Sequence, residues 1–384
     1  IELWGKSNKA DQAKWHPLLL HMLDAAAVTS MMWEKCLAND LKNDLSKTFG
    51  LKQEEMGNLL AFWVSLHDIG KAAPGFQKKN QDRFIALREM GLPFQESIFE
   101  DNGFHGTATT CILRKHFGEG GWQMPRKFRI GLAETLGGHH GIFPSNQEVN
   151  DYNDLTVLIE NKTWQSLQWE IFNRLETTIY PNRPLKYPEH TDEINAVLLI
   201  VSGLCSTADW IASNEDFFGY YLEPHDLTRY YENSRIKAIE ALSKLGWIGW
   251  QPNGQIISFE SMFPGFTPNP IQQATIGLSD DIRSPFLVII EAQTGSGKTE
   301  AALYLADALL QRENKSGIYL AMPTQATSNQ MFQRVSKFLA RRYAEQEINL
   351  HLVHGKALFN PKTSGFPISS IWSEAGETEG NLHS

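Results

Sequence analysis

The chain has 384 residues, of which 42% are hydrophobic and 21% charged, so it is long enough for two globular domains with substantial cores. Its 35 basic and 44 acidic residues give a formal charge of −9, which argues against a uniformly basic surface but allows a local basic groove for nucleic acid. Three scattered cysteines, Cys36, Cys111 and Cys205, favour a reducing cytoplasm over a disulfide framework.

The first 245 residues are predicted to form an all-α domain. Apolar residues recur at three- and four-residue spacing in segments 18–32, 56–67, 194–211 and 227–245, and few runs alternate with the two-residue period of strands. The longest apolar stretch near a helix, 196–204, is too short to cross a bilayer and no signal peptide opens the chain, so we expect no membrane contact. Because the chain begins with Ile1, we expect its true N-terminus to be missing.

Segment 246–270 is predicted to be a linker, because Gly and Pro cluster in it. Residues 271–384 are predicted to form an incomplete α/β RecA-like domain. Apolar runs at 286–291, 317–322 and 350–353 predict parallel strands, with helices expected at 299–311 and 325–343. The expected fold class is therefore multi-domain, with an all-α domain followed by a partial α/β domain.

Seven histidine and aspartate residues of the first domain interrupt apolar or glycine-rich segments: His21, His67, Asp68, His105, His139, His140 and Asp209. The pair His67-Asp68 ends an almost wholly apolar run, and His139-His140 is flanked by glycines, which indicates a close approach of the backbone to something else. Imidazole suits transition metals and a carboxylate can bridge two ions. The set therefore predicts a metal site.

Each of these residues alone has an ordinary explanation. A His-Asp pair at a helix end is more often a cap or a hydrogen-bonded pair, and a lone histidine such as His21 on an apolar helix is usually a core residue. The ordinary explanation of the doublet His139-His140 is that it lies in a surface loop. A buried carboxylate such as Asp209, however, requires a partner or a cation. We interpret the seven together as one metal-binding set.

In this order the set resembles the HD phosphohydrolase superfamily and, more narrowly, the nuclease domain of the CRISPR-associated helicase–nucleases of type I systems. The similar segments are Trp4-Gly5-Lys6-Ser7, residues 21–28, His67-Asp68-Ile69-Gly70-Lys71, His139-His140-Gly141 and Ala208-Asp209-Trp210. The resemblance implies two metal positions. The first would be held by His21, His67, Asp68 and Asp209, and the second by His105, His139 and His140 with Asp68 bridging.

Imidazole-rich ligation favours Fe, Mn, Co or Ni over Mg. The catalytic candidates are Asp68, as the bridging carboxylate, and Lys71, which would neutralise the scissile phosphate unless it only places charge at a helix end. Asp24 is either a partner of the ligands or a solvated or capping residue. The sequence shows no serine or cysteine nucleophile constellation, so the expected chemistry is phosphodiester hydrolysis by metal-activated water. We expect Asp68→Ala to abolish cleavage and His16→Ala, outside the set, to have little effect.

A phosphate loop follows the predicted strand 286–291 and opens a helix: Ala292-Gln293-Thr294-Gly295-Ser296-Gly297-Lys298-Thr299. The backbone N–H groups of residues 295–298, including Ser296, would cradle the phosphates of ATP. Lys298 would reach the β and γ phosphates, and Thr299 the Mg²⁺. Ala292 replaces the first glycine of the general motif, as is common in superfamily 2 helicases. The alternative is a chance Gly-rich turn.

The surroundings of the loop also resemble a superfamily 2 helicase. Gln272 resembles its adenine-reading glutamine, residues 322–327 its backbone-holding motif, and His354-Gly355 its next strand-contacting element. Candidate phosphate contacts, or else a solvated helix face, are Arg334, Lys337, Arg341 and Arg342. No Asp-Glu-x-His box follows His354, so the chain resembles a piece of a longer protein, and we expect weak ATP binding and poor hydrolysis.

The resemblance implies a cytoplasmic hydrolase of CRISPR antiviral defence, a metal-dependent single-stranded DNA nuclease coupled to an ATP-dependent helicase or translocase that degrades invader DNA. Its implied partners are single-stranded DNA and a guide-RNA surveillance complex at an R-loop. One alternative is an HD phosphohydrolase acting on nucleotides with an ATP-sensing P-loop domain, which the motif at 322–325 disfavours. The other is a non-catalytic ATP-dependent DNA-binding module, which the full ligand set disfavours.

Overall fold

The computed structural model describes residues 2–7, 14–94, 105–122, 124–159, 162–220, 226–248, 252–282, 286–313, 315, 317–343 and 350. The chain divides into two compact units, 1–242 and 243–384. The division lies close to residue 245, where the change in sequence pattern places the end of the helical domain.

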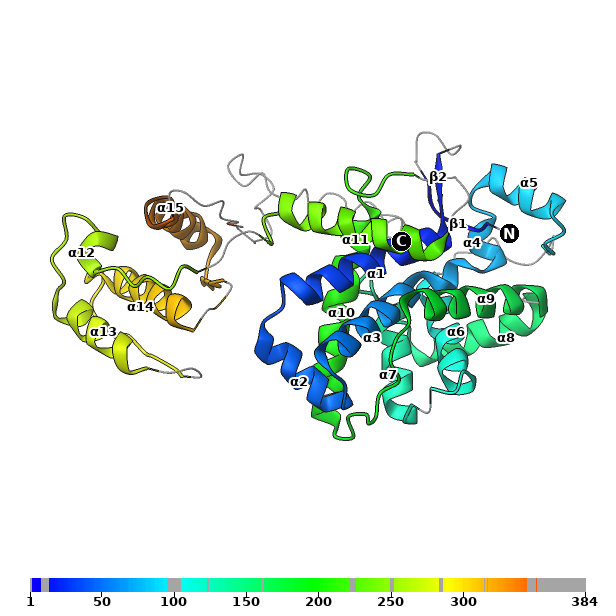
Figure 1. The fold of residues 1–384 in the computed structure, drawn as a ribbon, viewed down its shortest axis with the longest axis horizontal. Coiled ribbons are helices and arrows are strands. Elements are labelled where there is room, and N and C mark those ends of the chain that lie inside the picture. Colours follow the sequence, from blue (N-terminus) through cyan, green and yellow to red (C-terminus); the bar gives the residue numbers. More distant parts are fainter. Residues whose placement is uncertain are drawn as a thin grey trace, which may run out of the picture. The chain divides into compact units, whose positions relative to one another are not determined.

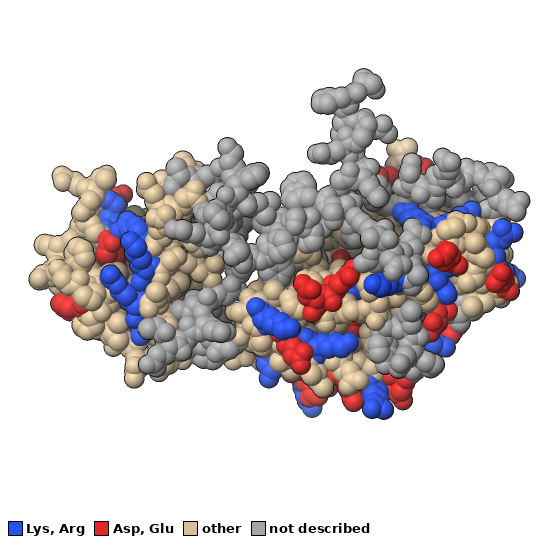
Figure 2. Space-filling model, turned by 90° about the horizontal axis from the view of Figure 1, so that it is seen from above, with Lys and Arg blue, Asp and Glu red and all other residues tan. Residues whose placement is uncertain are grey.

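Unit 1 is mostly helical, with one antiparallel strand pair, β1 (Trp4–Ser7) and β2 (Trp15–Pro17) (Figure 1). Its helices are α1 (Leu18–Lys35), α2 (Asn39–Phe49), α3 (Gln53–Ser65), the 3₁₀ helix η1 (Leu66–Lys71), α4 (Pro74–Gln77), α5 (Gln81–Glu89), α6 (His105–Glu119), α7 (Arg126–Gly137), α8 (Asn146–Ile159), α9 (Lys162–Ile179), α10 (Thr191–Ser213) and α11 (Leu227–Lys244). On its visible face Lys and Arg are interspersed with Asp and Glu (Figure 2), in agreement with the composition.

Helix α1 is buried around its whole circumference. Every residue from Leu20 to Trp33 is buried, and α1 packs against α3 and α10. Every residue from Leu59 to Gly70 is also buried, which spans the end of α3 and most of η1. A helix that is apolar on all sides is stable only inside a larger core. These two central segments therefore carry their polar residues into the interior of unit 1.

Helix α10 is longer than the apolar stretch 196–204 recognised in the sequence. It spans Thr191–Ser213 with a hydropathy of 1.6, so by length and composition alone it qualifies to cross a bilayer, contrary to our expectation. A core helix of a globular domain passes the same test. The buried residues of α10, such as Val201 and Ala208, belong to a helix that packs against α1 and α7.

Three glycines let neighbouring elements approach more closely than side chains would permit. A Cβ atom on Gly70 would lie 2.1 Å from the carbonyl oxygen of His105, and one on Gly106 would lie 2.2 Å from that of Gly137. A Cβ atom on Gly137 would lie 2.1 Å from Oγ1 of Thr110. The start of α6 is thereby held against both η1 and the end of α7.

Unit 2 contains α12 (Phe259–Met262), α13 (Pro270–Asp281), α14 (Lys298–Arg312) and α15 (Gln325–Arg342) in its described part. Its buried core consists of Phe259, Met262, Leu303, Tyr304, Val335 and Phe338. Two of these residues, Phe259 and Met262, come from the segment 246–270. That segment is therefore not a free linker throughout, because its apolar side chains help to build the core of unit 2.

The strands expected at 286–291 and 317–322 are not formed in the part of unit 2 that the structure describes. Both segments lack regular secondary structure there, and their side chains are exposed, with 84% exposure for Leu287, 74% for Ile289 and 90% for Tyr319. A buried parallel strand needs backbone partners beside it, and no described segment supplies them. The expected strands are thus wrong for this structure. Most of the third one, 350–353, lies outside the described residues.

We predict that Gly106→Ala destabilises unit 1 by about 1–3 kcal/mol, because the methyl group would overlap a backbone carbonyl of α7. Gly203→Ala is the matched control, since Gly203 lies within α10 and a Cβ atom there meets open space. Helix propensity should make that control neutral or slightly stabilising. Urea unfolding followed by circular dichroism measures both variants. A Gly106→Ala protein as stable as the wild type would contradict the close contact between α6 and α7.

Candidate metal centre and nucleotide site

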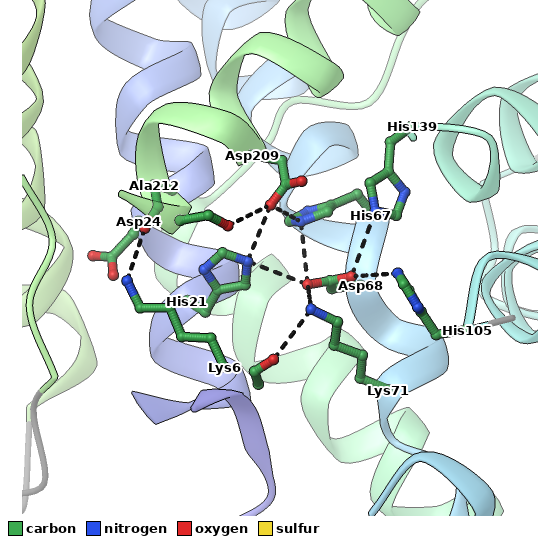
Figure 3. A network of polar contacts seen from close by, with 12 residues as sticks. Lys6, His21, Asp24, His67, Asp68, Lys71, His105, His139, Asp209 and Ala212 are labelled. Carbon is green, nitrogen blue, oxygen red and sulfur yellow. Dashed lines mark hydrogen bonds and ion pairs between the residues drawn. The ribbon is translucent and has the colours of Figure 1, made fainter. Parts of the chain in front are cut away.

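Five elements of unit 1 bring the seven predicted ligands together. His21 comes from α1, His67-Asp68 from η1 and His105 from the first residue of α6. The pair His139-His140 follows the end of α7, and Asp209 lies near the end of α10. Figure 3 shows the side chains of His21, His67, His105, His139 and Asp209 around that of Asp68, and Nε2 of His140 lies 3.2 Å from Nε2 of His105. Residues separated by almost the whole length of unit 1 thus form one cluster.

One group of candidate ligands is buried. The Nε2 atom of His21 lies 3.2 Å from Oδ2 of Asp68 and 3.3 Å from Oδ1 of Asp209. Nε2 of His67 lies 3.4 Å from Oδ2 of Asp68 and 3.3 Å from Oδ1 of Asp209. One ligand atom from each of these four residues lies within 4.8 Å of the others, so a single ion would reach all four.

A second group, nearer to the surface, contains His105, His139 and His140. Oδ1 of Asp68 lies 3.4 Å from Nε2 of His105 and 3.6 Å from Nε2 of His139. Nε2 of His140 lies 3.2 Å from Nε2 of His105. The two oxygens of Asp68 therefore face different groups, Oδ2 toward the buried one and Oδ1 toward the outer one.

Backbone carbonyls fix the orientation of two of the imidazoles. Nδ1 of His67 donates to the carbonyl of Val64 at 2.9 Å, and Nδ1 of His139 donates to that of Leu136 at 2.8 Å. A carbonyl can only accept, so the proton of each neutral ring lies on Nδ1 and Nε2 keeps a free lone pair. This is the arrangement in which a histidine is ready to bind a metal through Nε2.

Several polar atoms of the cluster are buried without a hydrogen-bond partner of good geometry: Nδ1 and Nε2 of His21, Oδ1 of Asp68, and Nε2 of His139. Such atoms normally cost a folded protein free energy unless something satisfies them. The carboxylate oxygens, and one nitrogen of each neutral imidazole, can donate a lone pair to a cation. The donor set therefore fits a divalent transition metal better than it fits a self-satisfied polar network.

The electrostatics of the cluster separate its histidines. Burial lowers the pKa of His67, but the charge of Asp68 and hydrogen bonds to Asp209 and Asp68 outweigh it and raise the pKa to about 10. Burial and the neighbouring His67 charge lower the pKa of His139 to about 3. Burial would raise the pKa of Asp68, yet Lys71 and His67 hold it well below its usual value. The raised pKa of His67 means that its protonated ring partly balances the negative charge of Asp68 and Asp209.

Lys71 lies beside the carboxylate rather than at a solvated helix end. Its Nζ is 2.7 Å from Oδ2 of Asp68 and donates to the carbonyl of Gly5 at 3.1 Å. The ammonium is thus fixed next to the oxygen that faces the buried group. Its catalytic role remains a prediction.

Asp24 and His16 form a separate buried pair. Nε2 of His16 lies 3.0 Å from Oδ2 of Asp24, while Ser234 and Tyr230 of α11 donate to the same carboxylate at 2.6 and 3.1 Å. Asp24 is therefore neither solvated nor a cap. His16 is fully buried and contacts Asp24, so we expect His16→Ala to destabilise unit 1, while its small effect on cleavage remains a prediction.

Sequence patterns did not identify some residues that support the ligands. Ser206 Oγ donates to the carbonyl of His139 at 2.6 Å, and Ser213 Oγ donates to Oδ1 of Asp209 at 3.1 Å. Lys6 reaches the end of α10, close to Asp209 (Figure 3). Ser206 and Ser213 each lie about one helical turn from Asp209 in α10, and this spacing alone only weakly indicates a supporting role. Lys6 has no such signal, since its partners are backbone carbonyls distant in sequence.

The predicted phosphate loop in unit 2 opens α14. Gly295 and Gly297 have φ values of 85° and 77°, a left-handed conformation that glycine adopts without strain, and a Cβ atom on Gly295 would meet open space. Lys298 Nζ donates to the carbonyls of Ala292 and Gln293 at 2.6 and 2.9 Å. The open loop at a helix N-terminus fits the phosphates of ATP, toward which Lys298 would turn.

Gln272 contacts this loop directly. Its Nε2 donates to the carbonyl of Gly297 at 3.3 Å, and its Oε1 accepts from the backbone N–H of Asn269 at 3.0 Å. Its contact with adenine remains a prediction. Thr299 Oγ1, the expected Mg²⁺ ligand, accepts from Arg334 at 3.3 Å.

The side chain of Arg342 is buried in an ion pair, so it does not belong to a solvated helix face. Its Nε donates to both carboxylate oxygens of Asp307 at 3.1 and 3.0 Å, and both side chains are buried. Thr324 caps α15 by accepting from the backbone of Thr327 at 3.2 Å. The predicted element His354-Gly355 lies outside the described residues.

Comparisons with known proteins match both units. A family model described as Cas3, HD domain, matches residues 4–218, and one described as DEAD/DEAH box helicase matches residues 269–363. The chain is 35% identical to the CRISPR-associated endonuclease/helicase Cas3 of Thermus thermophilus, over 99% of this chain and 40% of that protein. It is 29% identical to the CRISPR-associated nuclease/helicase Cas3 of Streptococcus thermophilus, over 93% of this chain and 40% of that protein.

Solved structures give the same picture. The structure of T. fusca Cas3 with ATP superposes with a TM-score of 0.75 at 28% identity, covering 94% of this chain and 40% of that one. A chain of a CRISPR RNA-guided surveillance complex before nicking has a TM-score of 0.67 at 26% identity, covering 88% of this chain and 38% of its own length. This chain therefore spans about two fifths of the length of these relatives.

We predict that binding of a divalent transition metal releases about one proton per chain at pH 7.5. His67, with its pKa raised to about 10, is protonated in the metal-free protein, and a histidine ligand must be neutral. His139, with its pKa lowered to about 3, has no such proton to lose. The affinity should accordingly rise with pH until about 10.

Isothermal titration with Mn²⁺ in buffers of different ionisation enthalpy counts the released protons. A binding heat that does not depend on the buffer would contradict the assignment of His67 as a protonated ligand.

Proposed function

The chain belongs to the Cas3 family, and on this basis we propose that unit 1 is a metal-dependent nuclease that cuts single-stranded DNA. The observation that supports this most strongly is Asp68, whose oxygens face two separate groups of histidine ligands. Ions held on the two sides of one carboxylate would activate water and stabilise the negative charge that develops on a phosphodiester.

The buried group, His21, His67, Asp68 and Asp209, would hold one ion and balance its charge with two carboxylates. The outer group, His105, His139 and His140 with Asp68, would hold the other. Iron, manganese, cobalt or nickel suits so many imidazoles better than magnesium does. The buried position would be occupied only when His67 has lost its proton.

The two groups differ in their access to a substrate. His21 and His67 are fully buried, whereas His140 is exposed and the His105 side chain is 15% exposed. A phosphate would therefore reach the centre from the side of His105 and His140. We propose that Lys71, held by Asp68 and Gly5, neutralises negative charge on the bound phosphate.

Unit 2 would bind ATP with Mg²⁺ through Lys298, Thr299 and the loop glycines, and contribute to a helicase or translocase that feeds DNA to unit 1. We propose that the protein works in the cytoplasm, in CRISPR antiviral defence, and that it degrades invader DNA opened as an R-loop by a guide-RNA surveillance complex. The family and the relatives named Cas3 support this role. We expect this chain, which spans about two fifths of the length of its relatives, to bind ATP weakly by itself.

We predict that the chain cuts a labelled single-stranded oligonucleotide with Mn²⁺ or Co²⁺ and without ATP. Asp68→Ala should abolish cutting, because both metal positions use this carboxylate. His139→Gln should reduce the rate by at least about 100-fold, because it removes one ligand. Circular dichroism of each variant reports whether the helical fold is retained.

His116→Gln is the matched control for His139→Gln. His116 is also a buried histidine, its Nδ1 also donates to a backbone carbonyl, that of Ile112 at 2.9 Å, and its Nε2 also lacks a partner. It lies outside the metal centre, so His116→Gln should cut at nearly the wild-type rate. If Asp68→Ala cut as fast as the wild type, the proposed function would be wrong. Turnover of dNTPs instead of DNA would favour a nucleotide phosphohydrolase.

A further inference from the structure

Two successive residues of strand β1, Gly5 and Lys6, contact residues that neighbour the candidate metal ligands. The carbonyl of Gly5 accepts from Lys71, the lysine that pairs with Asp68. The next residue, Lys6, extends its side chain toward the end of α10, where Nζ donates to the carbonyl of Ala212 at 3.1 Å and to that of Phe218 at 2.6 Å (Figure 3).

The contact with Ala212 lies in the turn that carries Asp209. Helix α10 ends at Ser213, and the last carbonyls of a helix have no partner within the helix. Ala212 follows Asp209 by three residues, so both lie in the same turn. An ammonium group at this position satisfies a terminal carbonyl and lies at the negative end of the helix dipole. It also joins the last turn of α10 to the loop residue Phe218.

Strand β1 is held in place by hydrogen bonds to Gln77 and by close packing against α1. The side chain of Gln77 accepts from the backbone N–H of Trp4 at 3.1 Å and donates to the carbonyl of Trp4 at 3.0 Å. A Cβ atom on Gly5 would lie 2.8 Å from Cα of Leu18, so the strand also lies tightly against the start of α1. Burial lowers the pKa of Lys6 to about 8, which shows how little water its ammonium retains.

We propose that Lys6 is a positioning residue of the metal centre, which holds the last turn of α10 so that Asp209 stays within reach of His21 and His67. This rests on the proposed metal-dependent function. Lys6 touches neither the ligands nor the substrate, and it acts through Ala212 and Phe218. Without its ammonium, the end of α10 would lose its connection to β1, and the Asp209 carboxylate would lose its fixed position. The outer group contains no residue of α10, so it should be affected less.

Metal affinity distinguishes this role from a general contribution to stability. Lys6→Met in the full chain should weaken binding of one Mn²⁺ by about 10-fold or more, as expected when a partner that orients a ligand is lost, and leave the other Mn²⁺ nearly unchanged. Lys6→Arg retains a cationic donor and should bind within about threefold of the wild type. Isothermal titration and equilibrium dialysis against Mn²⁺ measure both affinity and stoichiometry.

Lys42→Met is the matched control. Lys42 is also a buried lysine that donates to a carbonyl near a helix end, that of Glu34 in α1 at 3.0 Å, but no candidate ligand is near it in sequence. The Lys42→Met variant should have a lower melting temperature than the wild type but the same affinity for Mn²⁺. If Lys6→Met is not folded by circular dichroism, Lys6→Gln carries the same test.

The possible outcomes separate the two proposals. A wild-type chain that binds no Mn²⁺ would overturn the proposed function and this inference with it. A wild-type chain that binds two Mn²⁺ ions, together with a Lys6→Met variant that binds both equally tightly, would overturn only the role of Lys6. Equal losses of affinity in Lys6→Met and Lys42→Met would also overturn it, because general loosening would then explain the effect.

Discussion

The burial of one carboxylate, that of Asp68, is the constraint on which the organisation of unit 1 depends. An ionised group without water is costly unless cations or donors surround it. Asp68 is fully buried, and it is surrounded by Lys71 and by imidazoles from three other elements. The same geometry that lets the protein keep this charge inside also presents its two oxygens to two groups of metal ligands. The same carboxylates raise the pKa of His67 to about 10, so a metal that binds through His67 would have to displace its proton.

The surrounding structure serves to bring distant segments to this carboxylate at close range. Helix α1 can pass through the centre because most of its buried residues are apolar, while His21 and Asp24 bring polar groups into the interior. Glycines 70, 106 and 137 remove the side chains that would hold η1, α6 and α7 apart. Strand β1 then supports the floor of the site through Gly5 and Lys6. A small error in any of these contacts would move a ligand by more than a metal tolerates.

The members of the cluster could be predicted from the sequence because each is a polar residue in a place where its neighbours are apolar or glycine residues; their role as metal ligands remains a prediction. His21 is the clearest example, since it interrupts the apolar run from Leu18 to Leu23. Which oxygen of Asp68 faces which group, by contrast, depends on helix packing and has no local pattern. Lys6 was missed as a supporting residue because its partners, Ala212 and Phe218, are 206 and 212 residues away and contribute only backbone carbonyls.

The failures in unit 2 have a different physical origin. The segments 286–291 and 317–322 have strand-like composition, but composition sets only a preference, and strands exist through pairing with neighbours. The segment 246–270 has the composition of a linker, yet Phe259 and Met262 bury their side chains in the core of unit 2. The buried contacts of His16 with Tyr230 and Asp24 were not predicted, because Tyr230 is more than 200 residues away in the sequence.

The central claim is that one carboxylate serves two metal ions. Crystals of the chain grown with Mn²⁺ and measured at the manganese absorption edge test it most directly. The account predicts two anomalous peaks in unit 1, one bonded to each oxygen of Asp68, with His21, His67 and Asp209 around the first and His105, His139 and His140 around the second. A single peak away from Asp68, or none at all at saturating Mn²⁺, would contradict it.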